Sequence, residues 1–125
     1  MFKINEDKSI YITRGDIATI DVTASVSGEG YEFQEGDVVR FKVFEKKECE
    51  NVVFQKDVLV AETRMKVSIN LIGTDTKIGE LINKPKDYWY EIELNPETAP
   101  QTIIGYDEEG AKVFRLYPEG SELNE

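Results

Sequence analysis

Apolar and polar residues alternate along much of this chain with a period of two, the pattern of half-buried β-strands. The clearest run is residues 87–94, in which one side carries Tyr88, Tyr90, Ile92 and Leu94 and the other carries Asp87, Trp89, Glu91 and Glu93. Prolines at positions 85 and 96 bound this run, because proline cannot donate a ladder hydrogen bond. We therefore expect residues 87–94 to form the central strand, with its apolar side covered by a second sheet.

Similar alternation or apolar runs predict further strands at residues 9–13, 17–26, 38–45, 52–60, 65–71, 101–106 and 112–117. Polar residues interrupt 52–60, which indicates an edge strand with an irregularity near residues 55–57. Gly110 ends an acidic turn between the last two runs and predicts a β-hairpin. In the 65–71 strand we expect Met65 to point inward with the other apolar residues.

About seven or eight short strands, with turn signals at intervals of roughly ten residues, predict an all-β antiparallel sandwich of immunoglobulin-like type. One short helical turn is expected at residues 78–82, where Ile78, Leu81 and Ile82 have helical spacing. The hydroxyl of either Tyr88 or Tyr90 is expected to form a hydrogen bond to the loop that precedes the strand. We expect an N-terminal arm at residues 1–8, a single sandwich domain at 9–118 and an acidic flexible tail at 119–125.

Composition narrows the possible partners. The chain has 25 acidic and 15 basic residues, a net charge of −10, so a nucleic-acid backbone or an anionic membrane would repel it. Charged residues interrupt positions 1–8, so no signal peptide is expected and the protein is predicted to be made in the cytoplasm. Cys49 is the single cysteine and is expected to be a bystander.

Little in the sequence indicates catalysis. Without histidine, imidazole acid–base chemistry and histidine metal sites are excluded. Glu91 and Glu93 could act as a hydrolytic carboxylate pair, but they share one strand face and are better explained as solvating it. The acidic turn at residues 107–110 could attract calcium, although a hydrated turn is the simpler interpretation. We expect no enzyme activity and no cofactor or metal.

Trp89 is the main candidate for an interaction site. It shares its strand face with acidic residues, so a loop or the alkyl stem of a neighbouring Lys or Arg could simply cover it. Alternatively, Trp89 forms an interface or a sugar-stacking platform, because aromatic residues are enriched at both. Phe44, Tyr31 and Phe33 could extend such a patch.

Four segments together resemble a known family. They are Gly-Asp-Ile-Ala-Thr-Ile at residues 15–20, Gly-Asp-Val-Val-Arg-Phe-Lys-Val at 36–43, Thr-Asp-Thr at 74–76 and Asp-Tyr-Trp-Tyr-Glu-Ile-Glu-Leu at 87–94. Between about residues 11 and 117, the chain is similar to the amino-terminal β-sandwich of upper baseplate proteins in tailed phages of Gram-positive bacteria. The resemblance implies a non-enzymatic structural protein of a phage or prophage tail, made in the bacterial cytoplasm and located in the virion.

The expected partners are other phage tail or baseplate proteins, with a homo-oligomer also possible. The alternative that the residues leave open is a carbohydrate- or cell-surface-binding β-sandwich module, in which Trp89 and nearby tyrosines stack on sugars. Self-association or a tail partner would distinguish the first function, and saturable quenching of Trp89 by a sugar would distinguish the second.

Overall fold

A computed structural model describes residues 1–120 and shows an all-β protein, as the alternation predicted. Within those residues it has eleven strands: β1 (Phe2–Ile4), β2 (Ile10–Thr13), β3 (Ala18–Val22), β4 (Ala24–Val26), β5 (Glu29–Tyr31), β6 (Val38–Phe44), β7 (Val52–Leu59), β8 (Val67–Leu71), β9 (Lys86–Leu94), β10 (Gln101–Ile104) and β11 (Lys112–Tyr117). Residues 121–125, most of the predicted acidic tail, lie outside the described part.

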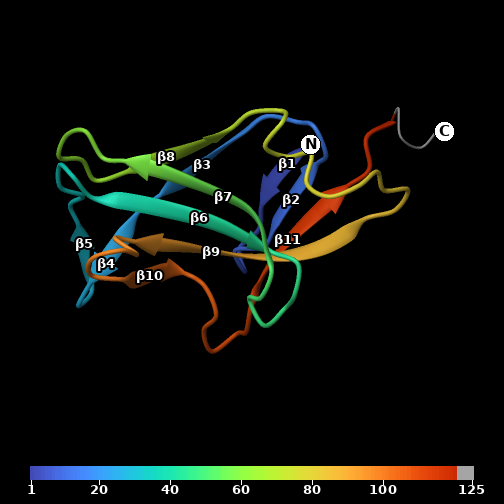
Figure 1. Ribbon diagram of the computed structural model, residues 1–125. Helices are drawn as coiled ribbons and strands as arrows, with labels where there is room; N and C mark the ends of the chain where they lie inside the picture. Colours follow the sequence, from blue (N-terminus) through green and yellow to red (C-terminus); the bar gives the residue numbers. More distant parts are fainter. Residues whose placement is uncertain (121–125) are drawn as a thin grey trace.

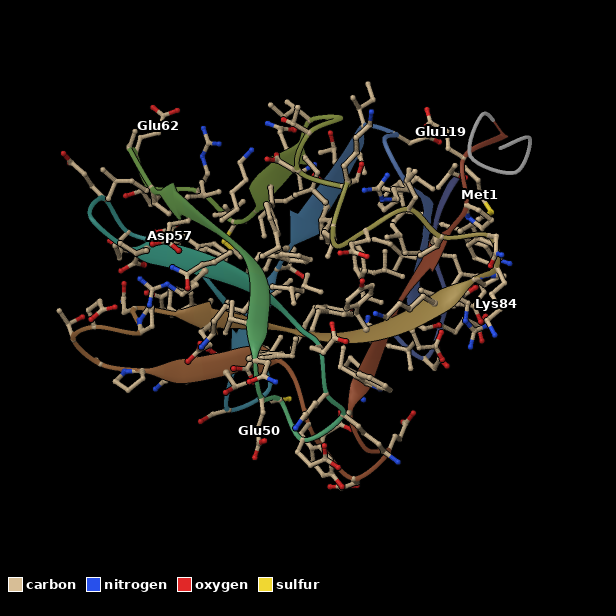
Figure 2. The ribbon with its side chains drawn as sticks, turned by 45° about the vertical axis from the view of Figure 1, so that its right-hand side comes forward. Met1, Glu50, Asp57, Glu62, Lys84 and Glu119 are labelled. Atoms are coloured by element: carbon tan, nitrogen blue, oxygen red, sulfur yellow. The ribbon has the colours of Figure 1, made fainter. Side chains whose placement is uncertain are left out.

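The largest element is a seven-stranded sheet, here called the large sheet, with strand order β1-β2-β11-β9-β6-β7 and β10 added beside β9. All of its pairs are antiparallel except β2 with β11. Two smaller pairs, β3–β8 and β4–β5, complete the fold (Figure 1). Met1 and Glu119 lie toward the same end of the molecule (Figure 2).

The β3–β8 pair forms the second layer of a sandwich-like arrangement. Its alternate residues are buried, Ile20, Val22 and Ile69 among them at no more than 3% exposed. They join the same core as Phe41, Ile92 and other residues of the large sheet. A two-stranded sheet buries one face only when another layer covers it, so the shared core holds the layers together. The immunoglobulin-like type of the sandwich stays a prediction.

The predicted central strand is confirmed. β9 lies between β6 on one side and β10 and β11 on the other. Tyr88, Tyr90, Ile92 and Leu94 are all buried, and the Tyr90 ring stacks on Phe41 of β6 with 5.6 Å between ring centroids. This inward row carries large aromatic area into the core, as the alternation indicated.

The hairpin predicted from residues 101–117 is wrong. β10 and β11 both run antiparallel to β9, so they run in the same direction and do not pair with each other. Gln101 begins opposite Leu94 and Leu116 ends opposite Lys86, so the two strands are successive parts of one return path along β9. Gly110 has a φ of +95°, but the tight turn that it forms with Asp107 lies within the loop that connects β10 to β11.

The helical turn predicted at residues 78–82 is also wrong, since this stretch has no helical hydrogen bonding. Gly79 takes a φ of +69°, outside the helical region. The Arg14 guanidinium donates to the carbonyls of Ile78, at 3.5 Å, and Gly79, at 3.0 Å. These long-range hydrogen bonds hold the segment in an irregular loop, from which the Ile78 side chain is buried in the core.

Three strand boundaries differ from those expected. The 17–26 run breaks at Thr23, because β3 pairs with β8 and β4 pairs with β5. Residues 1–8, expected as an arm, include β1, which pairs with β2. Met65 precedes β8 and is 51% exposed, so its predicted inward orientation is wrong.

β7 lies at the edge of the large sheet, as expected, but its irregularity is not at residues 55–57. The register instead shifts where Val43 faces Phe54 and Phe44 faces Val52, which leaves Val53 as the extra residue. A bulge at this point turns the end of β7 relative to β6.

The two tyrosines of β9 make different contacts with the rest of the chain. The Tyr90 hydroxyl donates to the carbonyl of Lys8 at 2.5 Å, which ties the N-terminal loop to the core strand. Tyr88 lies against the loop before β9, where a Cβ added to Gly79 would come within 2.7 Å of the Tyr88 hydroxyl oxygen. Tyr88 is therefore the residue that packs on the preceding loop.

Candidate interaction surface

Four apolar residues line up across the solvent-facing side of the large sheet. Trp89 of β9 lies opposite Phe44 of β6 and Val113 of β11, and Phe44 lies opposite Val52 of β7. These positions alternate with the buried ones, so their side chains project from the outer face. We call Val113, Trp89, Phe44 and Val52 the outer row.

Exposure varies along the outer row. Phe44 is only 3% exposed although it points away from the core, whereas Val52 is 50% exposed. Trp89 and Val113 are half-buried. The Lys42 ammonium lies over the Phe44 ring, 5.7 Å from its centre, and partly covers it. The accessible apolar area of the row therefore comes from Val52, Trp89 and Val113.

The loop between β6 and β7 lies beside the outer row. Burial raises the pKa of the Cys49 thiol, and the negative charge of Glu91 adds to this effect while Lys42 opposes it. A thiol with a raised pKa stays protonated and weakly reactive at neutral pH. Figure 2 shows Glu50 on the same loop projecting away from the sheet.

Ion pairs flank the outer row on both sides. On one side, Lys42 lies 2.6 Å from Glu93 and 3.5 Å from Glu91. On the other, Arg115 contacts Asp87 at 2.6 Å and packs over the ring of Tyr11 at 4.9 Å. The carboxylates on the Trp89 strand face are therefore neutralised by basic residues of the neighbouring strands.

This pairing also bears on the candidate carboxylate pair. Burial opposes the charge of Lys42, but its contact with Glu93 and the charges of Glu93 and Glu91 raise its pKa overall. Glu93 Oε1 is covered and accepts no well-directed hydrogen bond among the described residues, although it lies 2.6 Å from Lys42 Nζ. The contact is an ion pair. Glu91 and Glu93 share one ammonium group, which suits a structural role.

The structure does not bring the four predicted interface residues together. Trp89 and Phe44 are neighbours in the outer row, but Tyr31 and Phe33 pack edge-to-face at the far end of β6, with 5.3 Å between ring centroids. Phe33 is 0% exposed and belongs to the core. Phe33 therefore offers no exposed contact area.

Tyr31 is half-buried, and its hydroxyl donates to Asp37 at 2.7 Å. Burial raises the pKa of Asp37, but hydrogen bonds from the Gln34 amide, Asn95 and Tyr31 outweigh it and lower the pKa. This polar cluster fixes the loop before β6 at the opposite end from Trp89.

Sequence reasoning missed two members of the outer row, Val52 and Val113. Both occupy predicted strands, but the alternation of one strand does not say which residues of another strand lie beside it. The pairing register of β11, β9, β6 and β7 supplies that information.

The acidic turn considered for calcium is occupied by the protein's own groups. Asp107 Oδ1 accepts from the Glu109 amide at 2.9 Å and from the Lys112 ammonium at 2.7 Å, and these bonds lower the pKa of Asp107. Within residues 1–120, no group of three or more Cys, Asp or Glu side chains is arranged to hold a metal ion.

Three comparisons with known proteins, covering family models, curated proteins and solved structures, find no match to this chain. The described residues contain no helix long and apolar enough to cross a membrane.

Proposed function

We propose that this chain is a non-enzymatic structural component that acts through protein–protein assembly, with the outer row as its contact surface. The main support for this proposal is that four apolar residues align across four adjacent strands, with Val52 half exposed at one end of the row. Protein interfaces favour an aromatic and aliphatic centre bordered by charges. The ion pairs of Lys42 and Arg115 provide such a border.

The proposed setting is the tail or baseplate of a phage or prophage, with other tail proteins or further copies of this chain as partners. Support for this setting is the resemblance of residues 11–117 to the amino-terminal sandwich of upper baseplate proteins. A sheet face that buries apolar residues against a neighbour suits a subunit of a symmetric assembly.

The geometry favours assembly over sugar binding at Trp89. A sugar platform needs polar groups beside the ring that are free to bond hydroxyls, but Asp87 is held by Arg115 and Glu93 by Lys42. The carbohydrate-binding alternative therefore has no specific observation in its favour.

The test is sedimentation at several protein concentrations, together with the emission maximum of Trp89, the chain's one tryptophan. The wild type should associate as concentration rises, with a blue shift as Trp89 becomes covered. Val52→Lys should keep the protein monomeric. Leu59→Lys is the matched control, because Leu59 is 68% exposed on the same strand but lies away from the outer row.

A wild type that stays monomeric with constant emission would remove self-assembly through the outer row. Equal association by Val52→Lys would place the contact elsewhere. Saturable quenching of Trp89 by a glycan would support the carbohydrate-binding module instead.

A further inference from the structure

Charges of opposite sign are separated on two adjacent strands of the large sheet, β6 and β9 (Figure 1). On the outer face, the strand register places Arg40 opposite Glu93 and Lys42 opposite Glu91. Each cross-strand pair therefore has its cation on β6 and its anion on β9. The four side chains are between 16% and 20% exposed and are already held by ion pairs within the chain. A partner that faces them would therefore have little further side-chain motion to restrict.

A two-fold axis between β6 and β9, roughly parallel to the strands, makes this charge pattern self-complementary. When the outer faces of two copies meet about such an axis, β6 of each copy lies over β9 of the other. Lys42 then faces Glu91 of the second copy, and Glu91 faces Lys42 of the second copy, as an isologous interface requires. Sheets that pack face to face keep their strands within about 30° of each other, so this superposition fits their usual geometry.

The same axis also matches the outer row with itself. It passes between Trp89 and Phe44, which lie opposite each other, with Val113 beyond Trp89 and Val52 beyond Phe44. Trp89 of one copy therefore lies over the Phe44 position of the other, where the Lys42 ammonium covers the ring at 5.7 Å. An indole is the aromatic group that a cation contacts most favourably. Val113 of one copy lies over Val52 of the other, so apolar contacts border the centre on both sides.

The charges disfavour the other two-fold arrangement of the facing sheets. An axis along the outer row would place β9 of one copy over β9 of the other. Asp87 and Glu91 lie two residues to either side of Trp89 on the outer face of β9. This second axis would therefore superpose their carboxylates, and facing like charges oppose association. The charge pattern selects the axis that runs between β6 and β9.

We propose that the partner of the outer row is a second copy of this chain, docked face to face about a two-fold axis between β6 and β9. This inference rests on the proposed function, because it names the partner of the same contact surface. The net charge of −10 on each copy repels the two at long range. A Debye length of about 8 Å at physiological salt limits that repulsion, so the charges that face each other at contact determine the orientation.

The test is charge reversal on either strand, followed by mixing of the two variants. Lys42→Glu makes both strands acidic at this level of the sheet, and Glu91→Lys makes both strands basic. Each variant alone should self-associate at least about tenfold more weakly than the wild type, because like charges then face each other. An equimolar mixture should restore association, since an acidic face meets a basic one. Sedimentation measures the mass, and the blue shift of Trp89 emission should return with the mixture.

Two controls separate this effect from loss of folding and from net charge. Lys42→Glu combined with Glu91→Lys in one chain keeps opposite signs on the two strands, so it should self-associate as the wild type does. Lys66→Glu makes the same change of charge as Lys42→Glu. The Lys66 side chain is 59% exposed just before β8 in the other layer, so this substitution should leave association unchanged.

Stronger association by Glu91→Lys alone would indicate the axis along the outer row and would overturn the proposed one. A mixture that stays monomeric while the wild type associates would overturn it as well. If Val52→Lys still prevents association in those cases, the outer row stands as the contact surface and only the orientation is wrong. A monomeric wild type would overturn the second copy as partner. Equal association by Val52→Lys would overturn the outer row itself.

Discussion

The two faces of β9 serve different purposes although their residues alternate along one strand. On the inner face, Tyr88, Tyr90, Ile92 and Leu94 are at most 6% exposed and pack in a continuous core. On the outer face, Trp89 is half-buried and its acidic neighbours are paired with Lys42 and Arg115.

This difference separates folding from recognition. The inner face stabilises the folded state by burying apolar side chains. This burial depends on close packing, so the inner face tolerates few substitutions. The outer face stabilises the folded state through partly exposed ion pairs, which contribute less to the free energy of unfolding than apolar burial does. The outer face also leaves apolar area accessible to a partner. Substitutions on β9 and its neighbours should therefore divide by face.

The largest effect is expected for Ile92→Ala on the inner face. Ile92 is 0% exposed, so the truncation leaves a cavity between the layers and should cost about 2–5 kcal/mol. Glu91→Gln, next to it on the outer face, should cost less than about 1 kcal/mol. Urea unfolding of both variants measures the difference, and equal losses would refute the division between the faces.

The contact of the inner face with the preceding loop should be nearly as sensitive. Gly79→Ala places a Cβ 2.7 Å from the Tyr88 hydroxyl at a φ of +69°, so it should cost about 1–3 kcal/mol. Combining it with Tyr88→Phe removes the clashing oxygen and should recover part of the loss. If the double variant shows no recovery in thermal unfolding, backbone strain alone accounts for the cost.

The inner face was the part of the molecule that the sequence predicted well. Alternation along residues 87–94 identified the central strand and its buried side, because burial of one face leaves a period of two in a single strand. The same alternation ran through Thr23 without a break, yet β3 and β4 belong to different sheets. Alternation marks the two sides of a strand and does not identify its partners.

The outer face depends on pairing register, which no single segment specifies. The sequence identifies Trp89 as a candidate interface residue. Val52 and Val113 become candidates only because the pairing register places them beside Phe44 and Trp89. For the same reason, residues 101–117 resembled a hairpin although both strands pair with β9. Long-range pairing is the physical information that the local pattern lacked.

Lys42→Met tests whether the outer face contributes to stability at all. It removes the cation that Glu91 and Glu93 share and leaves the covered oxygen of Glu93 without an ion pair. Because the group is partly exposed, we expect a loss of about 1–2 kcal/mol. Adding Glu93→Gln should restore part of the stability in urea unfolding. A variant as stable as the wild type would show that the ion pairs are dispensable.

The smallest effect is expected for Tyr90→Phe, which removes the hydrogen bond from the Tyr90 hydroxyl to the Lys8 carbonyl. Removing the hydroxyl leaves the Lys8 carbonyl without its donor, at a cost of about 1 kcal/mol at neutral pH. Burial raises the pKa of Tyr90 well above its ordinary 10.0, and the charge of Asp7 adds to this. The neutral hydroxyl therefore stabilises the fold fully below pH 10.0, and this contribution is lost as the pH rises above that value.

Tyr90→Phe should accordingly flatten the alkaline limb of the stability profile. Lys42 also contributes to alkaline stability, because its pKa is raised in the folded state. Its contribution to the free energy of unfolding is complete below pH 10.5 and is lost as the pH rises through the pKa of the folded state. Lysine titration gives no near-ultraviolet tyrosinate signal, and the difference in that absorbance between the wild type and Tyr90→Phe isolates Tyr90 from the other five of the six tyrosines. If Tyr90→Phe leaves the alkaline limb unchanged while Lys42→Met flattens it, the outer face controls alkaline unfolding and the division between the faces fails there.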